Sequence, residues 1–440
     1  MKLPQAFLPA ALVFSCLAAA SLPEEETGLQ ERRQRAAREF SDGVLLLHSK
    51  AVTDFVADGY REQAAFFYLT GLENSPGTIL AIDGKTADSW LFTPPAAALA
   101  TTEVQPGAAD AKKLRLGHVV DWKELEGFLA QQALARAKIY YERQTAELPQ
   151  NLSAKEENRA PAWIQLLQIK WPALEFKPIG GRLASLMAVE SPDEQAASRA
   201  AARATVQAFL AGMSAIRPGL RQRSVEVVVE SACWNAGAHG VSFWPWVMAG
   251  PNAVFPKPFE SDSRYDHLDS VMQAGDLVRL DVGCEWRHHQ GDLGRTVPVS
   301  GRYTPDQREL WNAFVAAYRA GVQELREGAT EAQVFEAWKK ELLRRRATLN
   351  SALAKQAIDS WSDRKNIPYW QVHTMNLEAG FVEGALGAGM VIDFEPIASI
   401  GGQGYYLEDM FLITRDGAEL LTPGVPYTAE EIEAAMASHR

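Results

Sequence analysis

Cysteine is scarce in this chain, which has 3 cysteines among its 440 residues. So few cysteines exclude a small fold that is held together by a framework of disulfides. Cys16 lies in an N-terminal segment that we expect to be removed from the protein. Cys233 and Cys284 could pair in an oxidising compartment, but we expect both to be buried free thiols, because two cysteines do not make a framework.

Positive charge is also in short supply. The chain has 44 lysines and arginines against 55 aspartates and glutamates, which gives a formal net charge of −11. An acidic surface disfavours nucleic acid and anionic membranes as partners, so we expect neither. Apolar residues make up 47% of the sequence, which is typical of a globular protein, and the length suits two domains.

Long hydrophobic runs are missing except near the N-terminus. Residues 7–20, FLPAALVFSCLAAA, follow Lys2 and end in three alanines before Ser21. This run is too short to span a bilayer comfortably, and the pattern predicts a cleaved secretory signal peptide over residues 1–20. Lipoprotein anchoring at Cys16 is the alternative. We therefore expect an exported protein without a transmembrane segment, in a bacterial periplasm or outside the cell.

The rest of the chain predicts two domains of mixed α/β class. Residues 21–190 alternate between predicted helices (26–39, 121–137 and 153–169) and predicted strands (66–72 and the pair around a turn in 78–93). A capping box formed by Ser191 and Glu194 begins a new helix, which Arg217-Pro218-Gly219 should end near Ile216. Residues 191–440 then form the second domain, in which residues 224–234 are expected to be helical.

Acidic residues lie within predicted strands of the second domain. Asp281, Glu395 and Glu408 each stand in a segment whose other residues are mainly apolar, namely LVRLDVG, MVIDFEP and YYLEDMFLI. Burying three like charges without compensation would cost several kcal/mol each, and few lysines or arginines are near in sequence. A divalent metal ion would supply the missing charge. Carboxylates with one imidazole suit Mn²⁺, while Zn²⁺, Co²⁺ and Fe²⁺ are alternatives.

Histidines offer that single imidazole. A lone histidine such as His373, in YWQVHTMNLEAG, is more often structural than functional. His288 and His289 stand side by side before Asp292, but we expect them to occupy a solvated hairpin turn.

The order Asp281, Asp292, His373, Glu395, Glu408 resembles the metal ligands of metallopeptidase family M24, the aminopeptidase P and prolidase group. The segments that carry the resemblance are GDLVRLDVGCEWRHHQGDLGRTVPVSGRYTPDQ, HTMNLEAG, FEP and LEDMFLIT, with AIRPGL and VMAGPNA as further landmarks. FFYLTGLENSPGTILAID resembles the N-terminal domain that accompanies aminopeptidase P.

The resemblance implies a C-terminal pita-bread fold, in which a curved antiparallel sheet lies between two α/β halves. It also implies that the five residues hold two divalent metal ions and that a hydroxide bridging the ions attacks the scissile carbonyl. Glu395 would take the proton of the water. The implied substrates are peptides, with cleavage at Xaa-Pro bonds, and the implied assembly is a homodimer or tetramer.

The sequence departs from the family at residues that handle substrate. A histidine expected after GPNA falls near Lys257, a second expected seven residues after His373 is Gly380, and an arginine expected before the last glutamate is Tyr406. His267, Lys257 and Tyr406 are weak candidates to replace them. The alternative is therefore a diverged, weakly active or non-catalytic member of the fold that contains metal and binds peptides.

Overall fold

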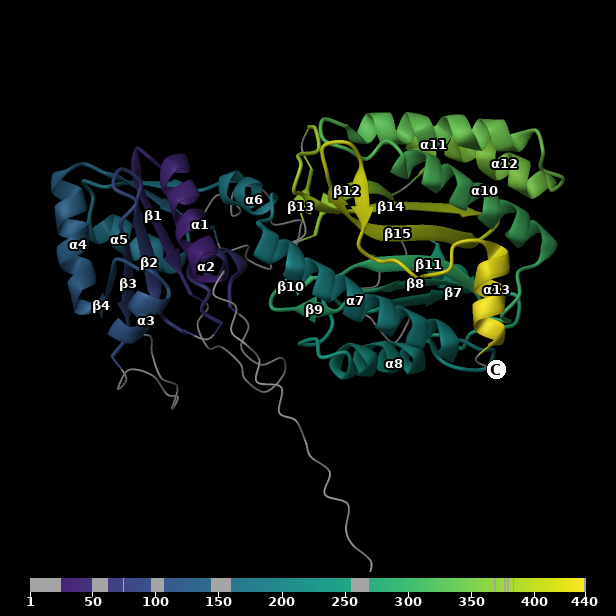
Figure 1. Ribbon diagram of the computed structural model, residues 1–440, viewed down its shortest axis with the longest axis horizontal. Coiled ribbons are helices and arrows are strands. Elements are labelled where there is room, and N and C mark those ends of the chain that lie inside the picture. The colour runs from purple at the N-terminus through teal and green to yellow at the C-terminus, as the bar shows by residue number, and fades with distance from the viewer. Residues whose placement is uncertain are drawn as a thin grey trace, which may run out of the picture.

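The computed structural model describes residues 25–49, 62–73, 75–95, 107–143, 160–254, 269–367, 369–375, 377, 380–382 and 384–438. The expected signal peptide and Cys16 lie outside the described residues, and so do Lys257 and His267. Figure 1 shows two bodies, each built on its own sheet, with the N-terminal body at the left.

The N-terminal body is a six-stranded mixed sheet flanked by helices. The strand order is β4-β3-β2-β1-β5-β6, with β1–β2 and β2–β3 antiparallel and the remaining pairs parallel. The strands are β1 Gly43–His48, β2 Ile79–Asp83, β3 Ser89–Thr93, β4 His118–Asp121, β5 Lys138–Tyr141 and β6 Glu175–Pro178. The helices are α1 Glu25–Glu39, α2 Ala64–Thr70, α3 Ala108–Lys113, α4 Lys123–Leu134, α5 Ala162–Lys170 and α6 Arg182–Met187.

Most of the predicted elements of this body are confirmed, but residues 66–72 are not a strand. Residues 64–70 form helix α2, which ends at Gly71 in the left-handed conformation (φ 68°). Phe66, Phe67, Tyr68 and Leu69 are all buried. A short apolar run that is buried on every side shows no periodicity by which strand and helix could be distinguished.

The C-terminal body begins with two long helices, α7 Pro192–Ala215 and α8 Gln222–Asn235, and both match their predicted positions. Its antiparallel sheet has the order β13-β12-β14-β15-β11-β8-β7, with β16 beside β15. The strands are β7 Trp246–Ala249, β8 Leu277–Val282, β11 Leu293–Pro298, β12 Tyr369–Thr374, β13 Gly380–Phe381, β14 Val391–Ile400, β15 Gln403–Ile413 and β16 Ala418–Leu420. A short hairpin comprises β9 Glu285–Trp286 and β10 His289–Gln290, and the remaining helices are α10 Pro305–Val322, α11 Glu331–Arg346, α12 Ala352–Trp361 and α13 Ala429–Ala437.

The two faces of this sheet differ in composition because side chains alternate along each strand. One face is apolar and packs against the helices in a single large core, to which Leu280, Phe394 and Leu407 belong. The opposite face carries the acidic residues of the same strands. In Figure 1, α10, α11 and α12 lie above the strands and α7 and α8 below them, and all five helices contribute to this one core.

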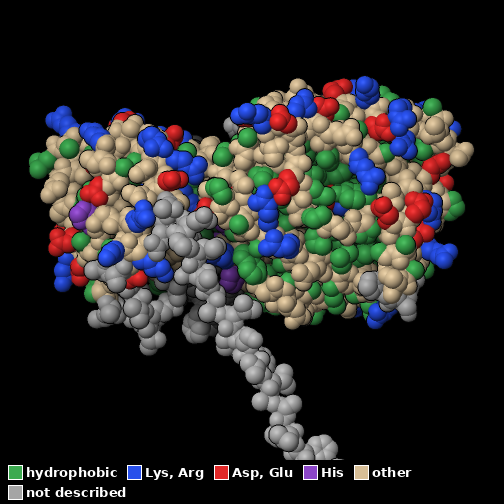
Figure 2. Space-filling model, in the orientation of Figure 1, with side chains coloured by type: hydrophobic (Ala, Val, Ile, Leu, Met, Phe, Trp, Pro, Cys, Tyr) green, Lys and Arg blue, Asp and Glu red, His purple; other side chains and the backbone are tan. Residues whose placement is uncertain are grey.

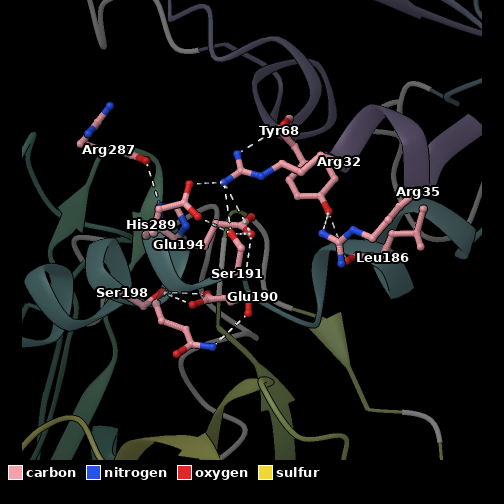
Figure 3. Close-up of polar contacts among 12 residues, drawn as sticks. Arg32, Arg35, Tyr68, Leu186, Glu190, Ser191, Glu194, Ser198, Arg287 and His289 are labelled. Carbon is pink, nitrogen blue, oxygen red and sulfur yellow. Dashed lines mark hydrogen bonds and ion pairs between the residues drawn. The ribbon is translucent and has the colours of Figure 1, made fainter. Parts of the chain in front are cut away.

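The two bodies meet through a polar and aromatic junction, which Figure 3 shows in close-up. Arg32 of α1 donates to Asp193 of α7 at 3.0 Å and to the hydroxyl of Ser191, which caps α7, at 3.5 Å. The ring of Phe67 lies 4.1 Å from that of His288, centroid to centroid. Helix α2 and the β9–β10 hairpin are thereby held together.

The expectation of a solvated turn at His288 and His289 was therefore wrong in part. The backbone does turn there, with left-handed φ values of 50° at Arg287 and 65° at His288. Both histidines are nevertheless buried, with exposed fractions of 8% and 5%. The Phe67 ring lies against His288, and α7 packs against β10, which carries His289. A local sequence pattern cannot reveal such contacts between distant segments.

The expectation of two free thiols was also wrong, because Cys233 and Cys284 form a disulfide. Their Cα atoms lie 5.4 Å apart, within the range that a disulfide bridges. The bond joins α8 to the residues that directly follow β8.

Within the described residues, no helix is both long and apolar enough to cross a membrane. On the face that Figure 2 shows, basic and acidic side chains are interspersed rather than gathered into one basic region.

Candidate metal centre

The five predicted ligands converge on one face of the C-terminal sheet. Asp281 lies in β8, Asp292 precedes β11, and His373, Glu395 and Glu408 lie in β12, β14 and β15. Gly294 of β11 pairs with Asp281 on one side and with Glu408 on the other. Directly paired residues of an antiparallel sheet point to the same side, so residues far apart in sequence become neighbours here.

Three of these residues form a compact cluster. Ligand atoms of Asp292, His373 and Glu408 all lie within 4.8 Å of one another. The His373 Nε2 atom is 3.3 Å from Glu395 Oε1 and 3.7 Å from Glu408 Oε1. The exposed fraction of each of these four residues is 8% or less. Their oxygens and nitrogen therefore face one another in a nearly dry site.

The carboxyl groups strongly perturb one another. Burial and the charge of Glu408 raise the pKa of Asp281 to about 8, and burial and the charge of Glu395 raise the pKa of Glu408 to about 7. The pKa of Asp292 is raised well above its usual value by burial and by Glu408. Burial alone would lower the pKa of His373, but the neighbouring carboxyl groups of Glu395 and Glu408 raise it well above its ordinary value. The cluster therefore lacks positive charge.

Two buried carboxyl oxygens without hydrogen-bond partners mark where a positive charge would be stabilising. Among the described residues, Asp292 Oδ1 and Glu408 Oε1 are buried without a hydrogen-bond partner. Buried carboxylates without partners are costly, whereas several carboxylates with one imidazole are a normal ligand set for a divalent metal ion. The residues present thus fit a divalent metal.

Tyr406 lies among the ligands. Its hydroxyl donates to Glu408 and is hydrogen-bonded to the carboxyl group of Asp281, and its side chain is fully buried. Gly294 makes room for the ring, since a Cβ at this position would lie 1.8 Å from Tyr406 Cε1. The Arg279 guanidinium is 5.6 Å from the centre of the same ring.

Sequence reasoning missed two residues of this face, Asp393 and Tyr369. Asp393 lies two positions before Glu395, and the alternation of strand β14 could have revealed it. Tyr369 is hydrogen-bonded to Glu395 through its side chain. Arg279 is buried with an exposed fraction of 2%, on the side of β8 that carries Asp281. No sequence signal distinguishes Tyr369 from other strand tyrosines.

The fold and the cluster define a metalloenzyme with a carboxylate-rich centre on the face of an antiparallel sheet. The chain belongs to metallopeptidase family M24, whose family model matches residues 196–415. The model of the aminopeptidase P N-terminal domain matches residues 29–140. The expected family is confirmed, and the family implies a divalent metal.

Relatives match over most of the chain. The Xaa-Pro aminopeptidase of Escherichia coli is 26% identical over 93% of this chain and 98% of its own. The Xaa-Pro dipeptidase of Pyrococcus furiosus is 28% identical over 56% of this chain and 67% of its own.

Solved structures confirm the pita-bread fold with its N-terminal domain. Aminopeptidase PepP of Pseudomonas aeruginosa superimposes with a TM-score of 0.74 at 23% identity, covering 95% of this chain and 99% of that one. Proline aminopeptidase P II of Yersinia pestis gives 0.73 at 24% identity, with coverage of 94% and 99%.

Proposed function

We propose that this chain is a dinuclear-metal exopeptidase that hydrolyses Xaa-Pro bonds at the N-terminus of peptides. The observation that carries the proposal is the convergence of Asp292, His373 and Glu408 within 4.8 Å, beside Asp281 and Glu395 on the same sheet face. The names of the relatives support the choice of Xaa-Pro peptides, both longer peptides and dipeptides. The catalytic domain is proposed to begin at residue 191, where α7 is capped.

The metal site is proposed to hold two divalent ions through Asp281, Asp292, His373, Glu395 and Glu408. Mn²⁺ is favoured because the set is rich in hard carboxylate oxygens with a single imidazole. When bound, such ions activate water and polarise the scissile carbonyl as Lewis acids.

The side chains of this chain then have distinct roles. Glu395 accepts the proton that the attacking water loses, since its carboxylate faces the cluster 3.3 Å from His373. The Tyr369 side chain is hydrogen-bonded to Glu395 and orients it. Tyr406 joins Glu408 to Asp281 through its hydroxyl and holds both carboxyl groups in place.

A second candidate function is metal-dependent peptide binding without efficient turnover. It is motivated by Gly380, which stands where a relative's histidine is expected, seven residues after His373. General acid–base help from such a group contributes roughly two to four orders of magnitude in rate. Tight binding of Xaa-Pro peptides without product would favour this candidate.

Export is proposed on two grounds. The first 20 residues have the pattern of a signal peptide, and Cys233 and Cys284 form a disulfide, a bond that persists in oxidising compartments. We also propose a homodimer or tetramer, by analogy with the family alone.

The test is a peptide panel incubated with the purified Mn²⁺-loaded protein. Xaa-Pro dipeptides and Xaa-Pro-Yaa tripeptides are compared with matched peptides that carry alanine in place of proline. Release of the N-terminal residue from the proline peptides, absent in Glu395→Ala, is expected. If neither peptide class is cleaved by a protein that contains two metal ions, the exopeptidase proposal is wrong.

A further inference from the structure

Asp393 is a buried carboxyl group to which neither the sequence pattern nor the family ligand set assigns a role. It lies in β14 with an exposed fraction of 0%. Among the described residues, both of its carboxyl oxygens lack a hydrogen-bond partner. A buried carboxylate without partners is strongly destabilising unless a positive group compensates it.

The register of the sheet places Asp393 in the metal centre. It pairs directly with His373 of β12 on one side and with Met410 of β15 on the other. Directly paired side chains have Cβ atoms about 4.5–5.5 Å apart and point to the same face. The Met410 sulfur in turn accepts the backbone N–H of Asp292 at 3.4 Å. Asp393 thus lies in a row between His373 and the residue that touches Asp292.

Electrostatic coupling agrees with this placement. After burial and Glu408, the charge of Asp393 is the next largest cause that raises the pKa of Asp292, ahead of Asp281 and Glu395. Asp393 therefore lies close enough to Asp292 for its charge to act on that carboxyl group.

A count of charges shows why the chain can tolerate the extra carboxylate. The face carries five carboxyl groups, Asp281, Asp292, Asp393, Glu395 and Glu408, hence five negative charges when all are ionised. Two divalent ions supply four positive charges. The buried guanidinium of Arg279, whose charge acts on Asp281, supplies the fifth.

We propose that the Asp393 carboxylate is an additional ligand of the divalent ion held by Asp292, His373 and Glu408. The inference rests on the metal centre of the proposed function, but it concerns a sixth protein ligand beyond the five in the family order. Coordination would satisfy oxygens that no described donor reaches.

The test compares Asp393→Asn and Asp393→Ala with the wild-type protein. Binding of Mn²⁺ to the metal-stripped proteins is followed by calorimetry, and the melting temperature is measured with and without metal. We expect both variants to bind one ion about 10–100-fold more weakly. We also expect the metal-stripped variants to melt at higher temperature than wild type, because an unpartnered buried carboxyl group has been removed.

Asp409→Asn is the matched control. Asp409 is an equally buried aspartate on the neighbouring strand, but it accepts from Arg295, Thr422 and Tyr427 and points to the other face. This variant should melt at lower temperature and keep its metal affinity.

The outcomes separate the two proposals. If wild type binds no divalent metal, the proposed function itself fails. If wild type binds metal and the Asp393 variants bind it equally well, only the additional ligand is refuted. Equal loss of affinity in the Asp393 variants and Asp409→Asn would also refute it, since the cause would be general damage to the sheet.

Discussion

At the scale of single residues, Tyr406 contacts two carboxyl groups of the candidate metal centre, which its position in the sequence does not reveal. It stands where the family pattern has an arginine, and its hydroxyl joins Glu408 to Asp281. Arg279, from the neighbouring strand β8, lies against its ring. The positive charge that the expected arginine would carry is thus supplied by Arg279 of β8, while Tyr406 supplies a hydrogen-bond donor. Residues that orient ligands in this way are important for metal affinity.

Tyr406→Phe should weaken metal binding by about 10–100-fold, because the variant keeps the ring and removes only the hydroxyl that orients two ligands. Competition with a metal-binding dye measures the change. Tyr405→Phe is the matched control, since Tyr405 is an equally buried neighbour whose side chain points to the opposite face. An unchanged affinity in Tyr406→Phe would show that the hydroxyl does not position the ligands.

Most of the candidate site could be predicted from sequence at this scale. The order of Asp281, Asp292, His373, Glu395 and Glu408 named residues that the structure brings to one face. The rest depends on contacts between strands. Only the register shows that Asp393 faces His373, and only packing shows that Tyr369 meets Glu395.

At the scale of elements, the disulfide fixes α8 to the strand that carries Asp281. Cys284 follows β8 by two residues, and its backbone N–H donates to Thr205 of α7 at 2.9 Å. Both long helices are thereby tied to the segment between Asp281 and Asp292. The start of α7 follows from sequence, because the capping box of Ser191 and Glu194 marks it. The disulfide does not follow, since pairing depends on distance in space.

Replacing both cysteines by alanine should lower the free energy of unfolding by roughly 2–4 kcal/mol, because the bond closes a long loop in the unfolded chain. The sequence separation of the two cysteines is 51 residues. Urea unfolding measures the change. In strong reductant, the free energy of unfolding of the wild-type protein should fall toward that of the variant. Equal free energies of unfolding for the oxidised wild-type protein and the variant would contradict the presence of the bond.

At the scale of the whole molecule, buried polar side chains lie at and near the junction between the two bodies. Arg32 bonds to Asp193 across the junction, while His289 is buried nearby with a pKa that burial lowers to about 4. The imidazole is therefore neutral in the folded protein at neutral pH. His289 lies in β10, which packs against α7, and this contact between distant segments explains why a local pattern predicted a solvated turn.

The folded protein should lose stability on acidification. Unfolded chains bind a proton at His289 near pH 6.5 and the folded protein only near pH 4, so stability falls as the pH falls through this window. The shift corresponds to roughly 3 kcal/mol, at about 1.4 kcal/mol for each pKa unit. Chemical unfolding at several pH values between 7 and 4 measures it.

His289→Gln removes this titrating group, so the variant should lose less stability than wild type between pH 7 and pH 4. His118→Gln, which changes an exposed imidazole of the N-terminal body, serves as the control and should follow wild type. Parallel pH profiles for wild type and His289→Gln would show that His289 is not held neutral.

The central claim is a metal-dependent exopeptidase, and one measurement tests it most directly. The purified protein is stripped of metal, reloaded with Mn²⁺, and assayed by mass spectrometry for the free N-terminal residue of an Xaa-Pro-Yaa tripeptide. The account predicts no product from the stripped protein, product after reloading, and none from reloaded Glu395→Ala. Product formation that is independent of metal, or unchanged in Glu395→Ala, would contradict it.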